Sequence, residues 1–79
     1  MAEAYILITV QAGKARDVYE ELSKIKEITH VDAIAGPFDI IALVKAPDFN
    51  AIGRLVIEKI QNIPGVERTL TCNIIHFEQ

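Results

Sequence analysis

The 79-residue sequence predicts an α+β domain with the element order β-α-β-β-α-β. Four stretches rich in β-branched and aromatic residues alternate with two stretches whose apolar residues recur every three or four positions. The two halves also repeat weakly, because Lys24-Ile25 and Lys59-Ile60 hold matching positions about 35 residues apart. A Gly36-Pro37 turn separates the halves. Two such β-α-β halves predict the ferredoxin-like arrangement, a four-stranded antiparallel sheet with both helices on one face.

The strands are expected over residues 3–10, 28–35, 38–46 and 66–77. A sheet with one face open to water should alternate apolar and polar residues, but three of these strands carry apolar residues on both faces. In the first strand, for example, Tyr5 and Leu7 alternate with Ile6 and Ile8. We therefore expect a second copy to cover the open face and the protein to be dimeric through its sheets. Burying ~500 Å² of apolar surface per subunit would contribute on the order of 12 kcal/mol before the costs of association.

The helices are expected over residues 15–25 and from about 49 to 62. Asp48 is the predicted N-cap of the second helix, in which Phe49 is predicted to be buried. Gly53 lies inside that helix, where glycine costs about 1 kcal/mol relative to alanine unless close packing requires it. On the first helix, Glu20 and Lys24 are spaced as a favourable ion pair.

Composition excludes several classes of function. The net charge is −3 and no stretch is strongly basic, so the sequence predicts no direct binding to DNA or to an anionic membrane. No apolar run of about 18 residues and no signal peptide is evident, which indicates a soluble, cytoplasmic protein. The apolar content of 51% is high for so small a domain and indicates a partner surface.

Residues with catalytic or metal-binding chemistry are few and scattered. Cys72 is the only cysteine, which excludes an internal disulfide, and its place in a strand predicts a small buried side chain. His30 and His76 have no ligand-spaced partners and are interpreted as surface or strand-edge residues. The sequence thus predicts no catalytic residues, no metal site and no cofactor.

The turn at residues 35–39 is the one place where a polar group stands out. Asp39 follows Gly36-Pro37 at the start of an apolar strand, where a carboxylate is unexpected. One interpretation is structural, since aspartate commonly accepts hydrogen bonds from turn amides. The other is functional: a carboxylate at a strand end, beside a glycine that lets a ligand approach the backbone.

The chain resembles the effector-binding module of the Lrp/AsnC regulators, the RAM domain, over essentially its whole length. The resemblance is carried by Val31, by Gly36-Pro37-Phe38-Asp39 leading into an apolar strand, by Ile63-Pro64-Gly65-Val66, and by Thr69-Leu70-Thr71. Transcription factors of this family also carry an N-terminal helix-turn-helix, which this sequence lacks. The chain therefore resembles the stand-alone versions, a single RAM-like domain over residues 1–79, and direct DNA binding is not implied.

The resemblance implies an assembly and a ligand. Family members pair with their sheets facing, and the dimers form rings such as octamers or decamers, with amino-acid effectors bound between dimers. The corresponding ligand-binding residues here are Ala35, Gly36, Pro37, Phe38, Asp39, Thr69 and Thr71. Asp39 would accept the ammonium of a free amino acid, and backbone amides near Gly36 or the two threonine hydroxyls would bind its carboxylate. The threonines are also interpretable as ordinary strand-forming residues.

The predicted function is amino-acid sensing and oligomerisation linked to transcriptional regulation of amino-acid metabolism, without enzymatic activity. Two alternatives stay open at this point. One is a ligand-free interaction module that co-assembles with full-length Lrp/AsnC regulators. The other is a small enzyme on a dimeric ferredoxin-like fold.

Overall fold

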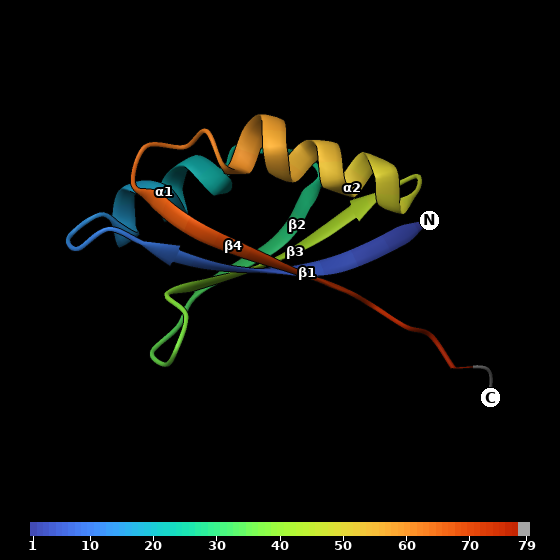
Figure 1. Ribbon diagram of the computed structural model, residues 1–79, viewed down its shortest axis with the longest axis horizontal. Coiled ribbons are helices and arrows are strands. Elements are labelled where there is room, and N and C mark those ends of the chain that lie inside the picture. The colour runs from blue at the N-terminus through green and yellow to red at the C-terminus, as the bar shows by residue number, and fades with distance from the viewer. Residues whose placement is uncertain (78–79) are drawn as a thin grey trace.

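The computed structural model describes residues 1–77 and confirms the predicted order of elements (Figure 1). All four strands and both helices lie where the sequence pattern placed them, with ends that differ by a few residues. The elements are β1 (Ala2–Val10), α1 (Ala15–Leu22), β2 (Ile28–Ala33), β3 (Ile40–Ala46), α2 (Phe49–Leu55), which continues as the π-helical turn η1 (Val56–Ile60), and β4 (Val66–Asn73).

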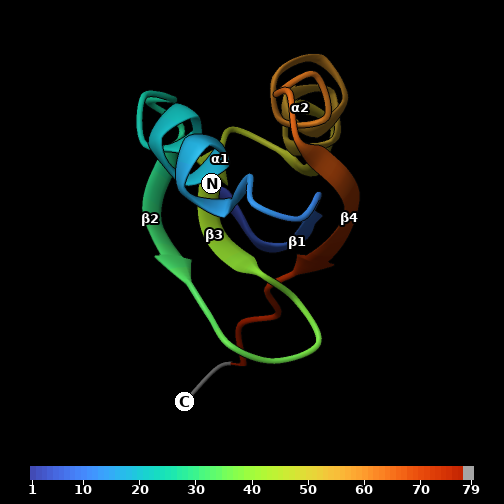
Figure 2. The same cartoon turned by 90° about the vertical axis from the view of Figure 1, so that its left-hand side faces the viewer.

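The four strands form one antiparallel sheet in the order β2-β3-β1-β4. Both helices cover the same face, as Figures 1 and 2 show from two directions, so the predicted fold class is confirmed. The end of β1, the start of α1, the end of β2 and the start of β3 meet at one end of the sheet, because Ile40 pairs with both Ile8 and Ala33. We call this the turn end of the sheet.

The hydrophobic core lies between the sheet and the helices. Alternate residues of β1 and β3 point into it, and Val18, Leu22, Ile52 and Ile60 close it from the helices. Each such aliphatic side chain contributes ~1.5–3 kcal/mol by leaving water. The sheet residues of this core are Ala2, Ala4, Ile6, Ile8, Ile40, Ala42, Val44 and Ala46.

The other face of the sheet, here called the bare face, has an apolar centre that no element of residues 1–77 covers. Tyr5 is 42% exposed and Leu70 is 51% exposed. The two-sided pattern expected from the sequence is therefore confirmed, although Cys72, predicted to be buried, is exposed on this face. The apolar residues that the register places on the bare face are Tyr5, Leu7, Ile41, Leu43, Leu70 and Cys72, and around them lie the polar residues Glu3, Thr9, His30, Asp32, Lys45 and Arg68.

Four strand ends differ from the prediction, the first of them by one residue, because β1 begins at Ala2. Residues 34–39 form the whole β2–β3 connection, so β2 ends before residue 35 and β3 begins after residue 38. The last strand was expected to reach residue 77 but ends at Asn73. The Ile74 amide still donates to the Glu3 carbonyl at 2.9 Å, but β1 begins at Ala2 and offers almost nothing further to pair with.

The second helix begins as predicted and continues differently. The Asp48 carboxylate accepts a hydrogen bond of 2.8 Å from the Ala51 amide, which confirms the N-cap. Phe49, expected in the core, lies in the first turn and is 50% exposed, so that prediction is wrong. A Cβ at Gly53 would meet no described atom within 4 Å, so close packing within this chain does not explain the glycine.

The first helix ends at Leu22, one turn earlier than expected. Lys24 therefore lies beyond it and pairs with Glu21 at 2.9 Å rather than with Glu20. The hydrogen bond to Glu21 raises the pKa of Lys24. Within residues 1–77, no helix is both long enough and apolar enough to cross a bilayer.

Candidate functional site

Asp39 is fixed by backbone hydrogen bonds at the turn end of the sheet. Its carboxylate oxygen Oδ2 accepts from the Val10 amide at 2.8 Å, and its own amide donates to the Ile8 carbonyl at 2.9 Å. Its carbonyl accepts from the Ile34 amide, also at 2.9 Å. Val10 lies where the β1–β4 register shifts, so the carboxylate satisfies an amide next to an irregular pair.

The structural interpretation of Asp39 is correct in that its carboxylate accepts a backbone amide. That amide, however, belongs to β1 rather than to the turn. The second oxygen, Oδ1, makes no hydrogen bond with any residue of the range 1–77. A half-buried carboxylate with one oxygen fixed and the other available can accept a proton donor from outside the chain.

The turn itself is open to solvent. Ala35, Gly36 and Pro37 are exposed, and Phe38 is half-buried. Gly36 does not need glycine for its backbone angle, since the positive-φ glycines of the described chain are Gly13 and Gly65. A Cβ at Gly36 would also meet no atom of residues 1–77 within 4 Å, so the space in front of it is open.

The two threonines of the predicted site lie elsewhere. The register pairs Thr69 with Ile8 and Thr71 with Ile6, on the helix side of β4. The Thr69 hydroxyl accepts a hydrogen bond of 3.0 Å from the Gln61 side chain. Because β1 lies between β3 and β4, a single subunit does not bring these hydroxyls together with the 35–39 turn.

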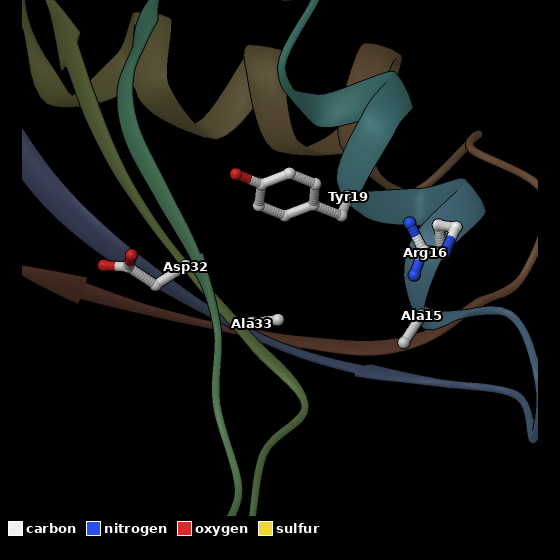
Figure 3. A pocket seen from close by; sticks show the side chains of 5 residues that line it. All are labelled: Ala15, Arg16, Tyr19, Asp32 and Ala33. Atoms are coloured by element: carbon white, nitrogen blue, oxygen red, sulfur yellow. The ribbon is translucent and has the colours of Figure 1, made fainter.

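A groove between α1 and β2 lies at the same end of the sheet as the turn (Figure 3). Its volume is about 470 Å³, and it is lined by Ala15, Arg16, Tyr19, Asp32 and Ala33. No pattern in the sequence predicted this groove. Arg16 and Tyr19 are three residues apart on one helix, a spacing that puts them on the same face, but only the fold places that face beside the strand that leads to the turn.

The polar groups of this groove are mostly cationic or neutral. Figure 3 shows the Tyr19 ring reaching from α1 toward β2, with the Ala33 methyl on the same side. The Asp32 carboxylate points to the other side of β2, where it lies 3.1 Å from His30 Nε2. Arg16 forms no ion pair with any residue from 1 to 77. The groove therefore offers a guanidinium, a phenol and small apolar surfaces.

No group of three or more possible metal ligands occurs in the described part of the chain. His30 and His76 are largely exposed and each lies near a single carboxylate, of Asp32 and Glu3 respectively. The prediction of surface histidines is confirmed.

Comparison with known proteins shows similarity to one family. The protein-family model of the Lrp/AsnC ligand binding domain matches residues 3–76 of this chain. An uncharacterised HTH-type transcriptional regulator of Pyrococcus furiosus is 38% identical over 71 residues, covering 86% of this chain and 47% of its own length. The leucine-responsive regulatory protein of Salmonella typhimurium is 32% identical over 71 residues, covering 85% of this chain and 43% of its own. The chain thus spans about half the length of the curated relatives it matches.

Solved structures show the same fold. FFRP-DM1 superimposes with a TM-score of 0.90 at 31% identity, covering 95% of this chain and 100% of its own. A transcriptional regulator of Neisseria meningitidis in complex with L-Met superimposes with a TM-score of 0.85 at 21% identity, covering 95% of this chain and 50% of its own.

Proposed function

The chain belongs to the Lrp/AsnC family as a ligand-binding domain, and on that premise we propose that it binds a free amino acid as an effector. The ligand lies at a contact between dimers, beside the 35–39 turn. Binding and assembly together make the domain a sensing module for transcriptional regulation of amino-acid metabolism. The domain acts without enzymatic activity of its own.

The observation that carries the proposal is the state of the Asp39 carboxylate. One oxygen is held at 2.8 Å by the Val10 amide, which fixes the group in place, and Oδ1 is available. An ammonium group is the complementary partner, since it carries three donors and a positive charge. Between subunits this pair would lose water, so it would be stronger than an ion pair on an open surface.

The exposed turn supplies the rest of the contact. The backbone around Ala35 and Gly36 is exposed, and the open space in front of Gly36 admits a ligand or a second subunit to the main chain. Pro37 and Phe38 form the apolar part of the same contact. Thr69 and Thr71 take part only from a neighbouring subunit, because β1 separates them from the turn within one chain.

The family supports the class of ligand. The matched family model describes a ligand-binding domain, and the Neisseria regulator with the same fold was solved with an amino acid, L-Met. Amino acids share an ammonium, which fits a carboxylate at a fixed position.

The bare face supports assembly into at least a dimer. It presents six apolar residues of the sheet, including half-exposed Leu70 and Tyr5, and has no cover within residues 1–77. Two such faces packed together would bury them, and dimers joined through the turn would close a ring such as an octamer or decamer. The same face also favours a second candidate function, a ligand-free module that co-assembles with full-length Lrp/AsnC regulators.

A ligand panel tests the proposal. Each of the twenty amino acids at millimolar concentration is added to the wild type and to Asp39→Asn, with melting temperature and calorimetric heat as readouts. We expect at least one to stabilise the wild type by about 2.7 kcal/mol at 100 times its Kd, which raises the melting temperature by several degrees.

Glu58→Gln is the matched control, since it removes an exposed carboxylate from the helix layer at a residue that lines neither the turn nor the groove. It should bind like the wild type, whereas Asp39→Asn should bind at least tenfold more weakly. If no amino acid affects the wild type, the sensing function is wrong and the ligand-free module is the better account. If Asp39→Asn responds like the wild type while keeping its assembly, the ligand does not contact Asp39.

A further inference from the structure

We propose that the groove between α1 and β2 receives the α-carboxylate and the side chain of the effector, with Arg16 as the carboxylate's partner. This inference rests on the proposed function and deepens it, because it assigns the part of the ligand that Asp39 cannot bind. It also names the class of ligand, an α-amino acid with an uncharged side chain.

The groove and the turn are neighbours along the backbone. Ala33 lines the groove, and the next residue, Ile34, donates its amide to the Asp39 carbonyl at 2.9 Å. On the other side, β1 runs from Val10, which holds the Asp39 carboxylate, through a short loop into α1 and Arg16. Both charged groups therefore lie at the turn end of the sheet.

The α1–β2 groove differs in charge from a second groove beside α1. A second groove of about 350 Å³ lies between α1 and the loop before β4, but three acidic side chains of α1 line it beside a single lysine. A carboxylate would be repelled there. In the α1–β2 groove the one acidic lining residue, Asp32, points to the other side of β2, where it lies 3.1 Å from His30 Nε2, and Arg16 forms no ion pair with any residue from 1 to 77. A guanidinium can bind a carboxylate through two parallel hydrogen bonds. The lining residues of the second groove are Lys14, Asp17, Glu20, Glu21 and Pro64.

The edge of the sheet adds hydrogen-bonding groups. β2 is an edge strand, and backbone groups of successive residues point alternately toward and away from the neighbouring strand. Because the Ile34 amide points toward β3, the amide and carbonyl of Ala33 point outward from the sheet edge, at a residue that lines the groove. A zwitterionic ligand can use both.

Size and lining define the side chain that fits. The volume of about 470 Å³ is within the range of small-molecule sites. Two alanines leave this space open, and the Tyr19 ring forms one wall (Figure 3). Once Arg16 binds the carboxylate, no charge in the groove remains for the ligand's side chain, so a neutral aliphatic, thioether or aromatic group is favoured.

The test compares acids with their amides. Leucine, methionine and phenylalanine, and the α-amide of each, are titrated calorimetrically into the assembled wild type, Arg16→Gln and the control Arg54→Gln, an exposed arginine on α2. Light scattering and circular dichroism confirm that each variant keeps its assembly and fold. If Arg16 binds the carboxylate, the wild type and Arg54→Gln should each bind at least one amino acid more tightly than its α-amide, by about tenfold or more. In Arg16→Gln, the acid should bind about tenfold more weakly and the difference between acid and amide should disappear.

A second variant tests the space rather than the charge. Ala33→Leu would fill the groove from the exposed edge strand, and it should weaken binding of phenylalanine more than binding of alanine. If the wild type binds an acid and Arg16→Gln retains the same preference for acid over amide, the assignment of the groove is wrong while the proposed function stands. If the wild type binds none of the twenty amino acids, both fail.

Discussion

The Oδ2 oxygen of Asp39 accepts a hydrogen bond of 2.8 Å from the amide of Val10, and this contact joins the start of β3 to the irregular end of β1. The two residues are 29 positions apart in the chain. One carboxylate thus holds the turn end of the sheet together while leaving its second oxygen available. The same group is both part of the scaffold and the center of the proposed ligand contact.

The hydrogen bond between Asp39 and Val10 should contribute to the stability of the fold. Asp39→Ala leaves the half-buried Val10 amide without its acceptor and should lower the free energy of unfolding by about 1–3 kcal/mol. Asp39→Asn retains a side-chain oxygen as acceptor and should lose less than half as much. Urea unfolding monitored by circular dichroism measures both. Equal losses for the two variants would show that the charge, rather than the hydrogen bond to Val10, stabilises the turn.

Replacing Gly53 and Gly65 by alanine should change the free energy of unfolding in opposite directions. Gly53 lies inside α2 with open space where a Cβ would be, so Gly53→Ala should raise the free energy of unfolding by about 0.5–1 kcal/mol. Gly65 has a φ of +101°, and its Cβ would lie 2.9 Å from the Cβ of Lys14, so Gly65→Ala should destabilise. Thermal unfolding at one fixed protein concentration measures both. A destabilised Gly53→Ala would indicate that a neighbouring subunit packs against that helix.

The bare face should mediate the dimer. Leu70→Lys places a charge opposite Leu7, on an apolar surface that residues 1–77 leave uncovered, and should convert the proposed dimer to a monomer at micromolar concentration. Ile57→Lys is the matched control, because it makes the same change at a 64% exposed residue of the helix layer and should leave a dimer intact. Multi-angle light scattering measures the masses. A monomeric wild type, or a dimeric Leu70→Lys, would contradict assembly through this face.

The 79-residue protein should not bind duplex DNA at physiological salt. Its net charge is −3, and nucleic-acid affinity depends on lysines and arginines that neutralise phosphates. A gel-shift assay with mixed-sequence duplex tests this. A submicromolar shift at such salt would mean that assembly gathers the few basic residues into a surface that the charge of one chain does not reveal.

Much of the fold was predictable because it depends on local patterns. The alternation of Ile6 and Ile8 with Tyr5 and Leu7 correctly indicated a strand with two apolar faces, and Asp48 correctly indicated where the second helix begins. The ends of elements were less predictable. Whether the last strand continues past Asn73 depends on what β1 still offers for pairing, which is a property of the register and not of the strand's own residues.

The site was predictable only in part, for a similar reason. Asp39 stood out because a carboxylate at the start of an apolar strand is unusual, but its partner, Val10, lies in a distant strand. Thr69 and Thr71 matched a family pattern, and the strand order separates them from the turn within one subunit. Arg16 carries no signal in the sequence, because only the packing of α1 against β2 makes it part of a groove.

A crystal structure of the assembled protein, soaked with a mixture of amino acids, tests the central claim most directly. We predict density for one amino acid at the turn end of the sheet, at a contact between dimers, with its ammonium within hydrogen-bonding distance of Asp39 Oδ1. Density at a site remote from the 35–39 turn, or no bound amino acid at concentrations of tens of millimolar, would contradict the account.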